Sequence, residues 1–297
     1  MLQERDISLL IDTDDPAAVF NEVRIIVSMM FKDYNFAKIQ ETFQDIRRLF
    51  GGKYPGYKPC NTMYHDLKHT METLLAMVRL MHGAYVKGVV LGEEYITLGI
   101  ISALMHDTGY IQRNDDTIGT GGKYTKIHVN RSIDFIKRYF ERKRCSSDGY
   151  MICKNNILCT GIYPEIDKIE FLTKENKIIG MMLGSADLLG QMSSRTYLEK
   201  LPLLYLEFRE AQINDYKDEL DLLKGTIEFY EKTKRRLKEK FMGVNNYVRY
   251  HFKERWNIDR DLYQEAIKKN IAYLKNLLEN HPRDYRSYLR RRPTFMT

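Results

Sequence analysis

Residues 61–82, with the sequence NTMYHDLKHTMETLLAMVRLMH, carry the clearest helical pattern in the chain. Apolar side chains recur there every three or four positions, which is the period of one face of an α-helix. A run rich in glycine and proline at 51–59 precedes this stretch and interrupts regular structure. We therefore predict a helix over 61–82 that packs on the rest of the protein through one face. That face comprises Leu67, Met71, Leu74, Leu75, Val78 and Met81.

The same period recurs on both sides of this stretch. Asp15 followed by Pro16 predicts a helix start, because aspartate caps a helix and proline is tolerated in its first turn. Strand-like alternation does not persist anywhere, so the fold class is all-α. The expected helices are 16–31, 36–50, 93–106, 128–142, 147–160, 175–191, 203–223, 224–241 and 260–279. A break is expected at 161–164.

Composition places the chain among ordinary globular proteins, with 43% hydrophobic and 29% charged residues. Apolar runs are far shorter than the ~20 residues of a membrane-spanning helix, and the first residues do not resemble a secretory signal. The four cysteines form no Cys-x-x-Cys pair and are expected to be free thiols. We therefore expect a cytoplasmic protein without a membrane partner.

The net charge of +7 is concentrated in two basic runs, 232–240 and 283–292. Such runs near a C-terminus are typical of solvated helix faces and tails. Nucleic-acid binding needs a recognisable module as well, and none is present, so a nucleic-acid partner is not expected.

Three segments combine ionisable residues with apolar neighbours. YHDLKH at 64–69 holds His65 and His69 four residues apart, so on a helix both rings project from the same face. SALMHDTGY at 102–110 ends an apolar helix with His106 and Asp107. GSADLLG at 184–190 sets Asp187 in an apolar segment.

Burying an unpaired carboxylate costs several kcal/mol, so Asp187 needs a partner. A lysine or arginine could serve, and so could a divalent cation that Asp187 shares with the histidines and Asp107. A single histidine on a helix is more often a structural residue; the conjunction of the three segments favours a metal. A mixed histidine and aspartate set suits zinc, manganese, iron or magnesium and does not choose among them.

The order His…His-Asp…Asp, with an apolar run before HDTG and SADLLG around the last aspartate, resembles the HD-domain phosphohydrolase superfamily. YHDLKH is similar to the Tyr-His-Asn-x-x-His motif of class I cyclic-nucleotide phosphodiesterases, and NILCT at 156–160 resembles a helix of those enzymes that ends in Thr-Asp. The resemblance covers roughly 53–207. It implies N-terminal helices at 1–52 packed on an HD-type catalytic core at 53–207. The C-terminal helices at 208–297 form an extension of the same compact domain.

The resemblance also implies roles. The first metal ion would be bound by His69, His106, Asp107 and Asp187, and Asp107 would bridge to a second ion. Metal-activated water would attack the phosphorus atom, and His65 would protonate the leaving oxygen as general acid. The substrate would be a phosphorylated small molecule or a nucleotide, above all a cyclic-nucleotide or other nucleotide phosphodiester.

Further residues are candidates for the same site. His128 begins a helix after a glycine-rich loop and is a candidate for contact with the second metal or the phosphate, as is Lys123. Gln191, one turn after Asp187, could line the site. Three positions depart from the phosphodiesterase pattern: Asp66 replaces asparagine, Tyr110 replaces histidine and Gly161 replaces aspartate.

Two other functions are compatible with these residues. One is a non-catalytic module that senses a nucleotide or regulates a partner, and the other is a helical scaffold with coincidental histidines. The aromatic side chains at 197–208 could belong to the core or to a homodimer face.

Overall fold

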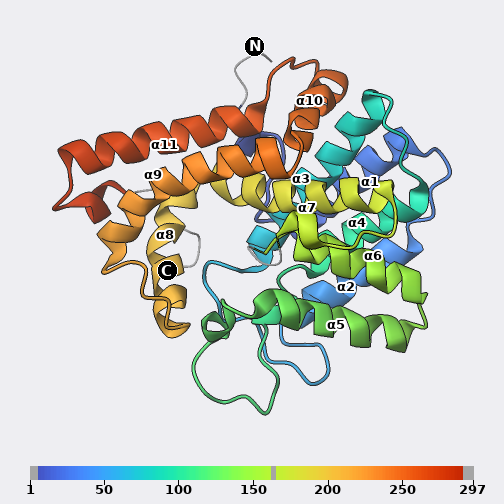
Figure 1. The fold of residues 1–297 in the computed structure, drawn as a ribbon, viewed down its shortest axis with the longest axis horizontal. Helices are drawn as coiled ribbons and strands as arrows, with labels where there is room; N and C mark the ends of the chain where they lie inside the picture. Colours follow the sequence, from blue (N-terminus) through green and yellow to red (C-terminus); the bar gives the residue numbers. More distant parts are fainter. Residues whose placement is uncertain (1–5, 162–164, 290–297) are drawn as a thin grey trace.

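The computed structural model describes residues 6–161 and 165–289, and the regular elements among these residues are all helices, with no β-strand. The all-α class is confirmed (Figure 1). Of the sequence predictions, part of the break at 161–164 and the end of the basic run at 283–292 lie outside the described residues. The longer helices are α1 (Pro16–Met30), α2 (Ala37–Phe50), α3 (Leu67–Val86), α4 (Glu93–Met105), α5 (His128–Lys143), α6 (Ser147–Leu158), α7 (Lys174–Ser193), α8 (Tyr197–Glu210), α9 (Glu219–Arg235), α10 (Val248–Trp256) and α11 (Leu262–Asn280).

Helix α3 forms the centre of the molecule and packs against α1, α4, α7 and α10 (Figure 1). Every side chain from His69 to Ala84 is buried, so the prediction of a single apolar face was wrong. A helix surrounded by other helices is covered on all sides, and its polar residues must then find partners inside the protein.

The predicted start of this helix, at residue 61, was also wrong. The helix begins at Leu67 because the Asp66 carboxylate accepts a hydrogen bond from the backbone N–H of His69, at 2.9 Å, as an N-cap. His65 therefore lies in the bent segment before the helix, and His69 lies in its first turn.

Helix α7 packs more extensively on α3 than on any other helix. Gly190 allows this close approach: a Cβ atom there would lie 3.0 Å from the backbone of Glu72 and Thr73 on α3. Asp187 lies one turn before Gly190 on the same helix. The contact therefore places Asp187 beside the first turn of α3.

The C-terminal third departs most from the sequence prediction. The continuous helix expected at 203–223 is wrong, because α8 ends at Glu210, two residues before Gln212, which adopts a positive φ of 54°. The residues expected as a helix at 224–241 are helical up to Lys240, although their helix begins earlier. Helix α9 starts anew at Glu219 under an Asp218 cap and ends in one π-helical turn, Arg236–Lys240. Helix α10 was not predicted. Helices α9 and α11 lie together along one side of the molecule, and α11 also contacts α7 (Figure 1).

Among the described residues, no helix combines the length and apolar character that a membrane crossing requires.

Candidate metal centre

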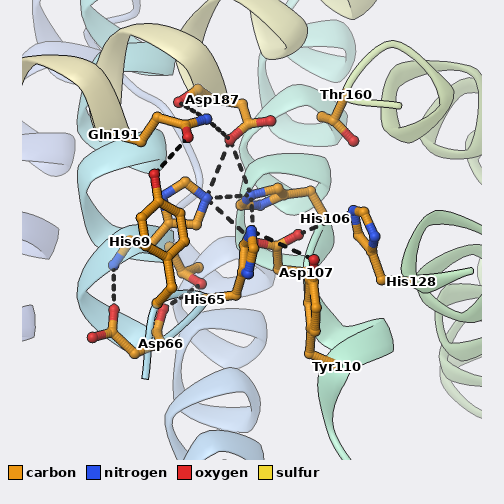
Figure 2. Close-up of polar contacts among 12 residues, drawn as sticks. His65, Asp66, His69, His106, Asp107, Tyr110, His128, Thr160, Asp187 and Gln191 are labelled. Atoms are coloured by element: carbon orange, nitrogen blue, oxygen red, sulfur yellow. Dashed lines mark hydrogen bonds and ion pairs between the residues drawn. The ribbon is translucent and has the colours of Figure 1, made fainter. Parts of the chain in front are cut away.

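Four side chains from three parts of the fold converge on one point (Figure 2). His69 comes from the first turn of α3, His106 from the C-terminal end of α4, Asp107 from the residue after it, and Asp187 from α7. Asp107 Oδ2 lies 3.2 Å from Nε2 of both histidines. Asp187 Oδ1 lies 3.1 Å from His69 Nε2 and 3.9 Å from His106 Nε2. The predicted cage residues are thus brought together.

These separations match what a divalent cation requires of its ligands. With bonds of about 2.0–2.1 Å in a tetrahedral shell, ligand atoms lie about 3.3 Å apart. The two Nε2 atoms are 3.3 Å apart, and the ligand atoms of His69, His106 and Asp107 all fall within 4.8 Å of one another. Asp107 Oδ2 is buried and has no hydrogen-bond partner among the described residues, as expected for an atom that ligates an ion.

The electrostatics of the metal-free cluster favour a positive charge at its centre. Burial by itself lowers the pKa of His69, but the carboxylates of Asp107 and Asp187 raise the value to about 10. Burial by itself raises the pKa of Asp107, but the imidazoles of His106 and His69 hold it well below its usual range. Without a metal, protons on the histidines supply the charge that the buried Asp107 and the half-buried Asp187 need.

The outer ring nitrogens of His106 and His128 fix the orientation of these two rings, whereas Nδ1 of His69 is buried without a hydrogen-bond partner among the described residues. His106 Nδ1 donates to the carbonyl oxygen of Ala103, at 2.9 Å, and His128 Nδ1 donates to that of Thr125, at 2.7 Å. In each ring the bond leaves Nε2 free to accept a metal ion. Burial lowers the pKa of His128, which keeps its ring neutral.

His128 faces the opposite oxygen of Asp107. The Nε2 atom of His128 lies 3.8 Å from Asp107 Oδ1. The other oxygen of Asp107, Oδ2, faces His69 and His106. Gly109 makes this possible, since a Cβ atom there would lie 2.0 Å from the carbonyl oxygen of His128. Gly109, which follows the His-Asp-Thr triplet, therefore allows the start of α5 to approach the candidate ligands His69, His106, Asp107 and Asp187, called the metal cluster below.

His65 lies at the edge of the same site, for a reason other than the predicted helical spacing. Its Nδ1 lies 2.6 Å from Oε2 of Glu207 on α8, and its ring stacks on Tyr110 at 4.2 Å between centroids. Tyr110 also stacks on His128, at 4.6 Å between centroids. The ring of His65 lies 5.8 Å from that of His69. The general-acid candidate is thus clamped between a carboxylate and an aromatic ring.

Helix α8 supplies two residues that the sequence reasoning missed. The buried Glu207 carboxylate contacts the His65 ring and also accepts a hydrogen bond from the backbone N–H of Tyr64, at 2.8 Å. The nearly buried ammonium of Lys200 donates to the Tyr64 carbonyl, at 2.8 Å, and to the Asp66 carboxylate, at 3.0 Å. The two residues lie seven apart on one face of α8, and that spacing of buried charges was the available signal.

The remaining predicted residues have other immediate partners. Lys123 Nζ lies 2.5 Å from Asp116 Oδ1. Gln191 accepts a hydrogen bond from the Tyr64 hydroxyl, at 2.9 Å, and its Nε2 lies 3.4 Å from Asp187 Oδ1. Gln191 therefore supports a predicted ligand. Figure 2 shows Thr160, at the end of the NILCT segment, on the far side of the site; its hydroxyl donates to the backbone of Ile157.

Fold and site together define an all-helical protein with a buried His-His-Asp group able to bind a metal ion. The family model described as Npun_R2479-like matches residues 116–246, which is less than half of the chain. The matching part includes His128, Asp187 and Glu207, and it excludes His65, His69, His106 and Asp107. No curated protein matches the chain.

Proposed function

We propose that this protein is a metal-dependent phosphohydrolase that cleaves a phosphoester, with nucleotide phosphodiesters as its preferred substrate class. The observation that carries the proposal is the convergence of His69, His106, Asp107 and Asp187 beside a histidine that Glu207 holds in place. The substrate class rests on the resemblance of the three motifs to HD-domain enzymes.

His69, His106 and Asp107 fit a divalent cation by donor type, separation and burial, and the half-buried Asp187 offers a further carboxylate oxygen beside them. When bound, such an ion supplies the Lewis acidity that polarises a phosphoryl oxygen and activates water. Asp107 directs its second oxygen toward His128, so these two residues would hold a second ion. Zinc, manganese, iron and magnesium all suit this donor set.

His65 would deliver a proton to the leaving oxygen from Nε2, because Nδ1 faces Glu207. The Glu207 carboxylate fixes the orientation of the His65 ring through Nδ1, and Tyr110 covers one face of that ring. A leaving alkoxide needs such a donor. A protein that only senses a nucleotide does not, so this arrangement favours an enzyme over the sensing alternative.

The test is hydrolysis of bis-(p-nitrophenyl) phosphate by the full chain with Mn²⁺, Zn²⁺, Fe²⁺ or Mg²⁺. The p-nitrophenolate leaving group needs little protonation, so the role of His65 is tested with 3′,5′-cyclic AMP, whose leaving group is an alkoxide. With that substrate we expect His65→Ala to lower turnover by about 10²–10⁴-fold while bound metal, measured by mass spectrometry, is unchanged. Asp107→Ala should lose both metal and turnover. His281→Asn is the matched control, because it removes a histidine that stacks on Tyr288 away from the site.

Two outcomes would contradict the proposal. Equal rates in the wild type, His65→Ala and Asp107→Ala would exclude catalysis at this site. Nucleotide-dependent shifts in melting temperature without turnover under any of the four metals would instead support the sensing module.

A further inference from the structure

A groove separate from the metal cluster runs between the end of α2 and the segment that carries His65. Its volume is about 630 Å³, within the range of about 300–1,000 Å³ typical of small-molecule sites. No residue of the metal cluster lines it. Phe50, Leu67 and Leu203 contribute apolar surface, and Met63 is 47% exposed beside them. A concave site with an apolar lining and a few polar groups at its rim is typical of small-molecule binding.

The rim of the groove is basic and poorly neutralised. Arg47 extends over the Phe43 ring, at 5.7 Å from its centroid, and forms no ion pair with any described residue. Arg48 lies 3.5 Å from Asp45, a carboxylate that also binds Lys143 at 3.0 Å. Lys53 adds a third positive charge without a carboxylate partner in the described part of the chain.

The other charges at the groove are already paired. Asp66 binds Lys200, and Lys68 lies 2.6 Å from Asp14. The unmatched charge is therefore positive and belongs to the rim. Three cations beside an apolar floor fit a ligand with an apolar body and a head of more than one negative charge. A phosphate monoester has about −1.5 to −2 charges at neutral pH and three acceptor oxygens, whereas a carboxylate has one charge.

We propose that this groove binds an amphiphilic phosphate monoester, with its apolar body on Phe50, Leu67 and Leu203 and its phosphate at Arg47, Arg48 and Lys53. The ligand would contact Asp66, the residue that follows His65 in the chain. Asp66 caps α3 and accepts a hydrogen bond from Lys200. Occupancy of the groove would thereby alter the position of His65. This second step rests on the proposed function, whereas binding itself does not.

The probe is dodecyl phosphate below its micellar concentration, titrated calorimetrically into the full chain with EDTA present to keep the metal cluster empty. We expect it to bind about tenfold or more tightly than dodecanol, dodecanoate or inorganic phosphate, because only dodecyl phosphate satisfies both floor and rim. The double variant Arg47→Glu/Arg48→Glu should weaken binding by about tenfold or more, and Met63→Glu should weaken it as well. All three substituted side chains are exposed.

Arg24→Glu is the matched control. Arg24 is also an exposed arginine over a phenylalanine ring, Phe36 at 5.3 Å, but it does not line the groove. Arg24→Glu should leave the affinity for dodecyl phosphate unchanged. Asp107→Ala, in the metal cluster, should also leave that affinity unchanged. Equal binding of dodecanol or dodecanoate, an unchanged affinity in the double variant, or loss of binding in Asp107→Ala would each overturn the proposal.

The link to the metal site is tested with bis-(p-nitrophenyl) phosphate. Dodecyl phosphate should change turnover in the wild type but not in Arg47→Glu/Arg48→Glu. An equal change in both proteins would show that the probe acts at the metal cluster and would overturn the link. Absence of hydrolysis under every metal would overturn the proposed function while leaving the binding result intact.

Discussion

A pair of buried histidines away from the metal cluster predicts that the fold loses stability in mild acid. His82 on α3 and His251 on α10 are both at most 1% exposed, and their Nδ1 atoms lie 3.2 Å apart. One Nδ1 must donate and the other accept, so a further proton would break the bond. Burial and the nearby Arg255 lower the pKa of His82 to about 4. Burial, then Arg79, His82 and Arg255, lower the pKa of His251 well below its ordinary value.

The sign and size of the effect follow from these pKa values. Because the pKa of His82 is lower in the folded chain than the ordinary value of about 6.5, the unfolded chain binds more protons below pH 6.5. The contribution of His82 is therefore complete above pH 6.5 and is lost as the pH falls toward 4. A difference of about 2.5 pH units corresponds to about 3 kcal/mol in full, of which about 2 kcal/mol is lost by pH 5.

The assay is urea unfolding followed by circular dichroism at pH 7.5, 6 and 5, in EDTA. His82→Asn removes the titrating ring. Between pH 7.5 and 5, the free energy of unfolding of this variant should therefore fall by about 2 kcal/mol less than that of the wild type. The comparison uses this difference, because the substitution also lowers stability at every pH. His281→Asn, near the end of α11, should retain the wild-type slope. Parallel slopes for wild type and His82→Asn would refute the reasoning.

Three further predictions concern the site. Gly109→Ala places a methyl group 2.0 Å from the His128 carbonyl oxygen and should lower the free energy of unfolding by about 2–3 kcal/mol in the same urea assay. The control Gly92→Ala, which has open space around it, should lower it by less than about 1 kcal/mol. Burial lowers the pKa of His69, but two carboxylates outweigh it and raise the value to about 10, so protons compete with the metal for this ring. The affinity for Zn²⁺ should therefore fall by up to tenfold per pH unit from pH 8 to 6. A pH-independent affinity in equilibrium titrations would contradict this. Lys200→Met removes a buried ammonium with two hydrogen bonds and should cost about 1–3 kcal/mol in urea unfolding at pH 7.5, whereas unchanged stability would show that the pairing contributes nothing.

Local signals explain which helices could be predicted from the sequence. The Asp15 cap with Pro16 in the first turn marked the start of α1 correctly, because both effects act within a few residues. Helix α10 has no comparable signal: its residues are mainly basic and aromatic, and it follows a short 3-10 turn, Val244–Tyr247. The break between α8 and α9 was missed because it depends on a left-handed backbone at Gln212, a residue type without a strong preference for that conformation.

The candidate metal ligands were accessible to sequence reasoning because the three short motifs that hold them occur together in one chain. A histidine and aspartate at the end of an apolar helix, and an aspartate within another, both need partners once they are buried. Their convergence depends on how closely α7 approaches α3, and Gly190 permits that approach. A glycine in a helix usually only weakens it, so this role becomes visible only when the neighbouring backbone is placed.

His65 shows where reasoning from one sequence reaches its limit. The four-residue spacing to His69 suggested two rings on one helical face, and the two rings do lie near each other. The cause is different, because His65 precedes the helix and is held by Glu207, 142 residues further along the chain. A periodic pattern reports contacts between neighbours on one element, whereas this position is set by a charge on another helix. Replacing Glu207 by glutamine should therefore slow turnover by about 10- to 100-fold with bound metal unchanged, because a charged hydrogen bond is lost at the proton donor alone. An equal loss of bound metal would show instead that Glu207 supports the cage as a whole.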